Sequence, residues 1–260
     1  MKIKENCWRL SNAQQAYFLK KYKSEKTFKK VRVIHETLAP NLRCLAPVVA
    51  YAKPYIVFRW VNGRPANYQN FMHCRRVFNM LSALHAQEAE FYHFPKLKLA
   101  QKWHMRLVQF QLLEMPLRSV LGNDYDALLS IAKYGFDHAV FPSGGNTLLH
   151  GDVAHHNFLL SEHGDTIIDF DLAVVGNEAE EWILWMHRLL PHYRYRLNEV
   201  LRIVPELEEY RKYFSLLLFP NELLREWLLF YDNEAMYPHL KLLTNWTLRQ
   251  WPQLVKQIEG

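Results

Sequence analysis

The stretch that most constrains this chain is TLLHGDVAHHNFLLSEHGDTIIDFD, residues 147–171. It holds an apolar strand end, a polar loop over residues 150–157, and two apolar runs that flank a glycine-containing segment, residues 161–165. Apolar runs on either side of such a segment indicate a β-hairpin. With the turn centred on the middle residue of that segment, Asn157 faces Asp169, and directly opposed residues in an antiparallel pair lie about 4.5 to 5.5 Å apart.

An amide oxygen and a carboxylate on facing strands can share one hard cation. Mg²⁺ takes oxygen ligands and is usually bound through one or two carboxylates together with substrate phosphates. Asn157 and Asp169 are therefore the predicted Mg²⁺ ligands, and Asp171 is a further candidate. Asp152 precedes them on the loop, where it can receive the proton of a hydroxyl group. An acid in that place, followed by an Asn and an Asp on a phosphate-bound metal, is the minimal set of groups for phosphoryl transfer.

Two motifs with a fixed spacing carry a family resemblance: HGDxxxxN over residues 150–157 and IDFD over residues 168–171. Together they resemble the aminoglycoside phosphotransferase and choline kinase-like family and, within it, the bacillar spore-coat kinase-like branch. The resemblance implies an α+β, two-lobed protein kinase-like fold. A small β-rich lobe with one helix would span residues 1–62, and a larger, mostly helical lobe residues 63–260.

The same resemblance implies an activity and the residues that carry it. We expect an ATP-dependent phosphotransferase that moves the γ-phosphate to a hydroxyl of a small molecule. Asp152 and His150 would be the catalytic residues, and Asn157, Asp169 and Asp171 would hold Mg²⁺. The acceptor stays unidentified, because its choice depends on side-chain placement across the helical lobe and the fold does not fix it.

A lysine near the N-terminus is the candidate for the nucleotide phosphates. Residues 1–23 are predicted to form two strands joined by a polar segment, residues 11–15. In the second strand Lys20 and Lys21 face opposite sides, because side chains alternate along a strand. The run FLK, residues 18–20, resembles the family's strand whose lysine holds ATP phosphates, which favours Lys20.

The sequence departs from the family pattern in the same region. No glycine precedes Gly63, so the glycine-rich loop that lets backbone N–H groups approach the phosphates is missing. Either lysine and metal hold most of the nucleotide, or the nucleotide binds weakly.

A helix is predicted over residues 24–39, where the family usually has a mid-helix glutamate that pairs with the strand lysine. This chain has KKVR there, residues 29–32, and its glutamates, Glu25 and Glu36, lie at the two ends of the helix. Both remain candidate partners of Lys20.

Two further strands are predicted over residues 45–52 and 54–61, and an Asn-Gly turn follows the second. In kinase-like folds such a strand leads into the hinge between the lobes. The resemblance therefore implies that the adenine meets backbone groups near Arg59, Trp60 and Val61. An ordinary hairpin edge explains the same pattern equally well.

Helical patterns fill most of the rest of the chain. The periodicity predicts one helix over residues 67–87, two or three helices within 88–140, and further helices over 182–258, segmented by prolines. Residues 88–140 carry no chemical signature of their own, whereas some aromatic residues of 182–258 are candidates for lining an acceptor pocket.

Composition limits the class of protein. Of 260 residues, half are hydrophobic and 14% aromatic, which is enough for a sizeable core. Three scattered cysteines fit a reducing cytosol and lack metal-ligand spacing, which weakens a zinc interpretation of the four histidines between residues 150 and 163. The N-terminus lacks a signal peptide's apolar core, and no apolar run approaches the ~18 residues of a membrane span. We expect a cytoplasmic protein; association with spores is compatible with this.

The net charge of +6 is uneven: residues 1–63 carry thirteen Lys and Arg against three Glu, a balance of +10. Such a region attracts polyanions, of which ATP is one and nucleic acid another. Nucleic acid is the less favoured partner, because no recognition motif or interleaved aromatic platform accompanies the charge. A catalytically silent scaffold, such as a spore-coat component, also stays open, because the glycines are missing and the helix glutamate is ambiguous.

Overall fold

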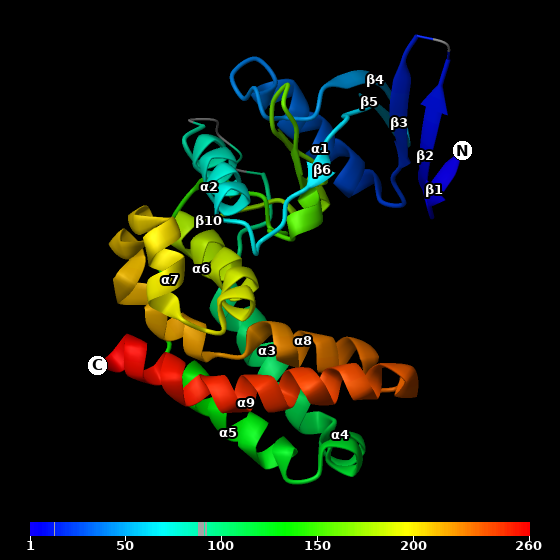
Figure 1. The fold of residues 1–260 in the computed structure, drawn as a ribbon. Coiled ribbons are helices and arrows are strands. Elements are labelled where there is room, and N and C mark those ends of the chain that lie inside the picture. Colours follow the sequence, from blue (N-terminus) through cyan, green and yellow to red (C-terminus); the bar gives the residue numbers. More distant parts are fainter. Residues whose placement is uncertain (13, 88–90, 92) are drawn as a thin grey trace. The chain divides into compact units, whose positions relative to one another are not determined.

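The computed structural model describes residues 1–260 except 13, 88–90 and 92. The chain divides into two compact units (Figure 1), of which the first holds Met1–Lys96 and Gly145–Glu178 and the second holds Leu97–Gly144 and Ala179–Gly260. The lobes predicted from the sequence, residues 1–62 and 63–260, divide the chain differently and stay a prediction.

A five-stranded antiparallel sheet forms the N-terminal part of the first unit, with the order β1-β2-β3-β5-β4. Its strands are β1 (Lys2–Lys4), β2 (Cys7–Ser11), β3 (Ala16–Lys21), β4 (Val48–Ala52) and β5 (Tyr55–Arg59). Four of the five strands were predicted. β1 was not, because a three-residue strand is too short to show an alternating pattern.

The helix predicted over residues 24–39 exists as α1 (Glu25–Leu38), which packs against this sheet. It begins after Ser24, whose hydroxyl accepts a backbone N–H of the first turn and so satisfies one of the donors left free at a helix start. The ring of His35 lies 5.2 Å from that of Phe58 in β5. The buried face of the helix consists of Phe28, Val31, Ile34, His35 and Leu38.

The rest of the first unit combines short strands with one long helix. The strands form a three-stranded sheet, β6-β8-β9, and a two-stranded sheet, β10-β7. The elements are β6 (Arg64–Pro65), α2 (Phe71–His85), β7 (Thr147–Leu149), η1 (His155–Asn157), β8 (Phe158–Leu160), β9 (Thr166–Ile167), η2 (Phe170–Leu172) and β10 (Val174–Gly176), where η denotes a 3₁₀ helix.

The predicted hairpin exists, but its predicted register is wrong by one residue. Phe158 pairs with Ile167, so Asn157 faces Ile168, whose N–H donates to the Asn157 carbonyl at 3.0 Å. The turn holds four residues, 161–164, instead of being centred on residue 163. The hydroxyl that begins this turn donates to the carbonyl of its last residue at 2.6 Å and fixes its length. Asp169 therefore follows the end of β9 and is not opposite Asn157.

The second unit is helical. Its helices pack around large buried aromatic residues, among them Trp103, whose ring stacks on that of Phe219 with centroids 4.8 Å apart. The elements are α3 (Leu99–Leu112), α4 (Glu114–Leu121), α5 (Asp124–Asp137), α6 (Glu178–Leu189, which begins at the last residue of the first unit), η3 (Leu190–Tyr193), α7 (Leu197–Ile203), η4 (Pro205–Leu218), α8 (Asn221–Phe230), η5 (Glu234–Met236) and α9 (Tyr237–Glu259).

The predicted fold class is confirmed: a β-rich N-terminal region with one helix is joined to a mostly helical C-terminal part. Prolines stand at or near the start of several C-terminal helical segments, as predicted, because proline lacks the N–H that a helix interior requires. No helix in the described part of the chain is long and apolar enough to cross a membrane.

Candidate active site

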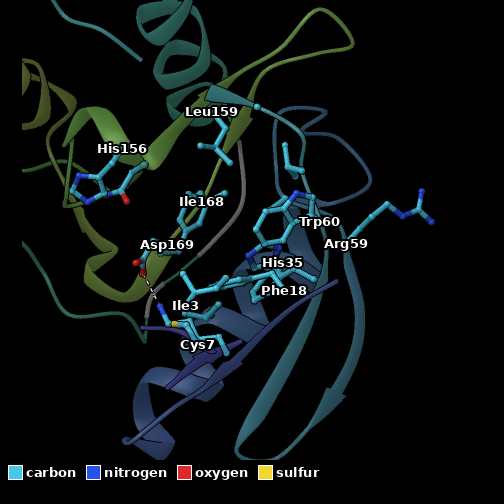
Figure 2. Close-up of a pocket in the computed structure, with 18 of the residues that line it drawn as sticks. Ile3, Cys7, Phe18, His35, Arg59, Trp60, His156, Leu159, Ile168 and Asp169 are labelled. Atoms are coloured by element: carbon cyan, nitrogen blue, oxygen red, sulfur yellow. Dashed lines mark hydrogen bonds and ion pairs between the residues drawn. The ribbon is translucent and has the colours of Figure 1, made fainter. Parts of the chain in front are cut away.

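The site is organised around an ion cluster in the first unit. Lys20 Nζ lies 2.7 Å from Asp169 Oδ1 and 2.8 Å from Asp171 Oδ2, and the side chain of Lys20 is only 12% exposed. Figure 2 shows the bond to Asp169 at the edge of a cavity. Strand β3 thus supplies the cation, and the segment after β9 supplies both carboxylates.

Backbone geometry places the two carboxylates. Asp169 has a φ of 66°, in the left-handed region that aspartate tolerates better than most residues. The chain then turns into η2, which brings Asp171 back toward the same ammonium group. Strand β9 is held on both sides, by β8 and by the Leu45 segment, so its end is fixed.

The pKa values of the cluster reflect burial and mutual charge. Burial opposes ionisation of Asp169, but the adjacent Lys20 ammonium outweighs it and holds the pKa of Asp169 below its usual value. Burial raises the pKa of Asp171, and the negative charge of Asp169 adds to the effect. For Lys20, burial disfavours the charged form, yet the two carboxylates raise its pKa. Lys20 is therefore an ammonium ion at neutral pH.

The polar loop before β8 is held together by its own side chains. His150 is fully buried; its Nε2–H donates to the Ile168 carbonyl at 2.9 Å, and its Nδ1 accepts the Asp152 N–H at 3.3 Å. Asn157 Nδ2 donates to the Asp152 carbonyl at 3.0 Å and to its Oδ2 at 3.1 Å. Both His150 nitrogens are thus engaged with backbone groups, and the Nε2 bond ties the loop to Ile168, the residue before Asp169.

Gly151 is required in this loop for two reasons. Its φ is +79°, and a Cβ atom added there would lie 2.1 Å from the Leu172 carbonyl oxygen. The loop and η2 therefore approach each other more closely than any other residue type would allow.

A cavity of about 380 Å³ adjoins the cluster. Of the predicted site residues, the structure brings six to its wall: Lys20, Arg59, Trp60, Val61, Asn157 and Asp169. The other three, His150, Asp152 and Asp171, do not line it but are each bonded to a residue near or on its wall.

The predicted hinge residues differ in what they present to the cavity. The Trp60 ring lies among the lining side chains, whereas the Arg59 guanidinium extends away from them (Figure 2). The Arg9 guanidinium stacks on Trp60, 4.5 Å from the ring centroid. Val61 makes no backbone hydrogen bond to any other described residue, so its N–H and carbonyl remain available.

Neither candidate glutamate pairs with Lys20. Glu25 bonds lysines at 3.0 and 2.9 Å, and Glu36 bonds an arginine of its own helix at 2.8 Å. In the middle of α1, where a glutamate was expected, Lys30 instead donates to the backbone carbonyls of Asp171 and Ala173 at 2.7 and 2.8 Å. The link between α1 and the carboxylate segment is therefore made by a lysine and backbone oxygens.

Comparison with known proteins assigns the family. A family model described as "Phosphotransferase enzyme family" matches residues 4–213. The chain belongs to this family. No curated protein sequence matches it.

Solved structures of phosphotransferases share the fold. An aminoglycoside phosphotransferase from Alicyclobacillus acidocaldarius has a TM-score of 0.70 at 15% identity, covering 99% of this chain and 91% of that one. The choline kinase LicA from Streptococcus pneumoniae has a TM-score of 0.54 at 11% identity, covering 100% of this chain and 91% of that one. The third structure is a thermostable mutant of aminoglycoside phosphotransferase APH(4)-Ia in ternary complex with ADP and hygromycin B. It has a TM-score of 0.56 at 14% identity, covering 98% of this chain and 94% of that one. The predicted family resemblance is confirmed, while the spore-coat branch stays a prediction.

For this phosphotransferase family member, sequence reasoning missed several residues of the cavity wall. Lys4, Cys7, His35 and His156 line it without having been predicted. His35 lies seven residues after Phe28 on the apolar stripe of α1, a signal that was available. Cys7 lies beside Lys20 because the two residues pair across β2 and β3, and this could be predicted only with knowledge of the strand register.

Among the residues that the structure describes, no group of three or more His, Cys, Asp or Glu side chains is arranged to hold a metal ion. The cluster described above contains two carboxylates, those of Asp169 and Asp171.

Proposed function

We propose that the protein transfers the γ-phosphate of ATP to a hydroxyl group of a small molecule, with Asp152 as the catalytic base. The observation that carries this proposal is the convergence of Lys20 with Asp169 and Asp171 beside a cavity, although Lys20 and Asp169 are 149 residues apart in sequence. A cation and two carboxylates beside a ligand-sized cavity suit a metal–triphosphate complex. Membership of the phosphotransferase enzyme family supports this reaction class.

The cavity is the proposed nucleotide site. Its volume of about 380 Å³ lies within the range of roughly 300 to 1,000 Å³ that ligand sites occupy. Lys20 would meet the phosphates, the Trp60 ring would stack on the base, and the free backbone of Val61 would bond the edge of the base. Arg59 would contribute its backbone, because its guanidinium extends away (Figure 2). The ADP in the APH(4)-Ia complex supports an adenine nucleotide.

The oxygen groups at this site fit Mg²⁺. Asp171 Oδ1 is buried and has no hydrogen-bond partner in the described part of the chain, a deficit that typically costs about 1 to 3 kcal/mol and that a cation would remove. Asn157 Oδ1 also accepts no hydrogen bond from a described residue, since only its Nδ2 is engaged. We therefore propose Asn157, Asp169 and Asp171 as the ligands. Bound there, Mg²⁺ would neutralise charge on the β- and γ-phosphates.

The residues of the loop have separate roles in this proposal. The Asp152 carboxylate accepts the proton of the acceptor hydroxyl as the hydroxyl oxygen bonds to the γ-phosphorus, and the bond from that phosphorus to the ADP leaving group breaks. The Asn157 amide holds that carboxylate by donating to its Oδ2, and His150 holds the loop by its two backbone bonds. His150 is thus a positioning residue here. Lys20 neutralises phosphate charge once the nucleotide is bound.

The acceptor is proposed only by class. The names of the similar structures, an aminoglycoside phosphotransferase and a choline kinase among them, support a hydroxyl-bearing small molecule. Residues 1–62 would form the nucleotide-binding lobe and residues 63–260 the catalytic and acceptor-binding lobe.

Turnover on a panel of hydroxyl compounds tests the proposal. Asp152→Asn preserves the shape of the side chain but cannot accept the proton, so ATP turnover should fall by about 100-fold or more. Asp137→Asn, at the exposed end of α5, is the matched control and should retain wild-type turnover. Equal turnover by wild type and Asp152→Asn would remove the catalytic assignment.

Calorimetry of ATP with and without Mg²⁺ separates binding from chemistry. Metal and nucleotide complete each other's ligand set, so they should bind with a positive coupling of about 1 to 3 kcal/mol. Asp169→Asn should lose most of this coupling, and Asp152→Asn should keep it. If the wild type binds no nucleotide at millimolar concentration, the silent scaffold becomes the better interpretation.

A further inference from the structure

We propose that Lys4 binds the phosphate groups of the nucleotide and takes the place of the missing glycine-rich loop. This inference rests on the proposed function, because it names a further residue of the same site. Lys4 is the last residue of β1 and lines the cavity from the turn between β1 and β2.

The charge of the cluster shows why a second cation is needed. One ammonium group, that of Lys20, lies between the carboxylates of Asp169 and Asp171. Negative groups therefore outnumber positive ones, and Lys20 already has two partners. Even with a metal ion, a triphosphate carries net negative charge into this region, so binding is favoured by a cation that is not already paired.

Lys4 is such a cation. Its side chain forms no hydrogen bond or ion pair with any described residue, and the residue is exposed, so its ammonium group can reorient. Arg59 is the third Lys or Arg residue on the cavity wall, and its guanidinium extends away from the cavity (Figure 2).

Strand pairing brings Lys4 and Lys20 near each other, and both line the cavity. Lys4 pairs with Cys7 across β1 and β2, and Cys7 pairs with Lys20 across β2 and β3. The β1–β2 ladder is irregular between Lys2 and Lys4, so it is the shared cavity wall, and not the register, that shows both lysine side chains reaching the same space. Neighbouring strands lie about 4.7 to 4.9 Å apart. The two lysines are therefore about 10 Å apart at the backbone, a span that their side chains can close around a phosphate chain. Ile3 and Cys7 mark this edge of the cavity in Figure 2.

The turn between β1 and β2 favours phosphate binding by a side chain. Asn6, not glycine, adopts its positive φ of 60°, and its carbonyl accepts the Lys21 N–H at 2.9 Å. The turn is thus tied down to β3 and carries side chains at every position. A lysine at its start can supply charge that the turn's backbone does not offer.

Calorimetry with three ligands tests the inference: Mg²⁺-ATP, Mg²⁺-ADP and adenosine. Lys4→Gln should weaken Mg²⁺-ATP binding by about three- to tenfold, the effect of losing one partly exposed charge contact. The loss should be smaller for Mg²⁺-ADP and absent for adenosine, which has no phosphate. Raising the salt concentration should reduce the difference in Mg²⁺-ATP affinity between the wild type and Lys4→Gln. Lys4→Arg should keep most of the affinity for Mg²⁺-ATP.

Lys21→Gln is the matched control, because Lys21 is an exposed lysine of β3 that does not line the cavity. It should bind all three ligands as the wild type does. Unchanged Mg²⁺-ATP affinity in Lys4→Gln overturns the inference, and so does an equal loss for adenosine, which would indicate a general distortion. These results leave the proposed function intact, provided the wild type binds Mg²⁺-ATP. A wild type that binds no nucleotide would instead overturn both.

Discussion

The close approach of Gly151 to η2 gives the sharpest prediction of the structure. In Gly151→Ala the new Cβ would lie 2.1 Å from the Leu172 carbonyl oxygen and 2.8 Å from its carbon, both backbone atoms that cannot rotate away. The positive φ of +79° costs an alanine about 1 to 2 kcal/mol, and forcing an extra carbon into a packed site typically costs about 1 to 3 kcal/mol. We expect a total loss of about 2 to 5 kcal/mol in the free energy of unfolding.

Gly144→Ala is the matched control. Its φ is +71°, almost the same, but nothing lies within 4 Å of the added Cβ. It should show only the backbone cost of about 1 to 2 kcal/mol. Urea unfolding followed by circular dichroism measures both variants, and the difference between them isolates the steric contact. Because the displaced η2 carries Asp171, Gly151→Ala should also weaken Mg²⁺-ATP binding. If Gly151→Ala costs no more than Gly144→Ala, the close packing of the loop on η2 is refuted.

Three further predictions concern the surroundings of the cavity. Burial lowers the pKa of His35 from 6.5 to about 4, so the unfolded state takes up a proton at a higher pH than the folded state does. The free energy of unfolding should therefore fall as pH falls from 6.5 to 4, by up to about 1.4 kcal/mol per pH unit. In urea titrations at several pH values, His35→Leu should flatten this part of the stability-versus-pH curve. Lys30→Met leaves two carbonyls within residues 171–173 without their donor and should lower the free energy of unfolding by about 1 to 3 kcal/mol. It should also weaken Mg²⁺-ATP binding, measured by calorimetry. Unchanged binding would show that α1 does not position the carboxylates. Arg76→Met removes a two-point contact with the Asp165 carboxylate and a bond of 2.7 Å to the Ser161 carbonyl at the β8–β9 turn. Because these side chains are partly exposed, thermal unfolding should show a loss of about 1 kcal/mol.

The sequence by itself indicated most of the N-terminal strands, helix α1 and the family. Alternation showed that Lys20 and Lys21 face opposite sides of their strand, and the structure has Lys20 inside and Lys21 exposed. Ser24 and the apolar stripe after it defined α1 closely. These features depend on contacts between near neighbours along the chain, so a local pattern is sufficient to predict them. The spacing of the two motifs likewise indicated the phosphotransferase family that the family model assigns.

Only the tertiary structure decided which groups meet. A single-residue change in turn length moved Asn157 from its predicted place opposite Asp169 to a place opposite Ile168, because a hydroxyl within the turn and not the apolar pattern sets that length. The partners of Lys20 also changed, from a helix glutamate to Asp169 and Asp171.

The physical reason is the range of the interactions. Ion pairs and strand register depend on distances of a few ångströms between segments that are far apart in sequence, and a local pattern carries no information on those distances. Lys30 illustrates this: the sequence shows only a lysine where glutamate was expected, and its contact with the carboxylate segment exists because the folded chain brings two carbonyls within 2.8 Å of its ammonium group.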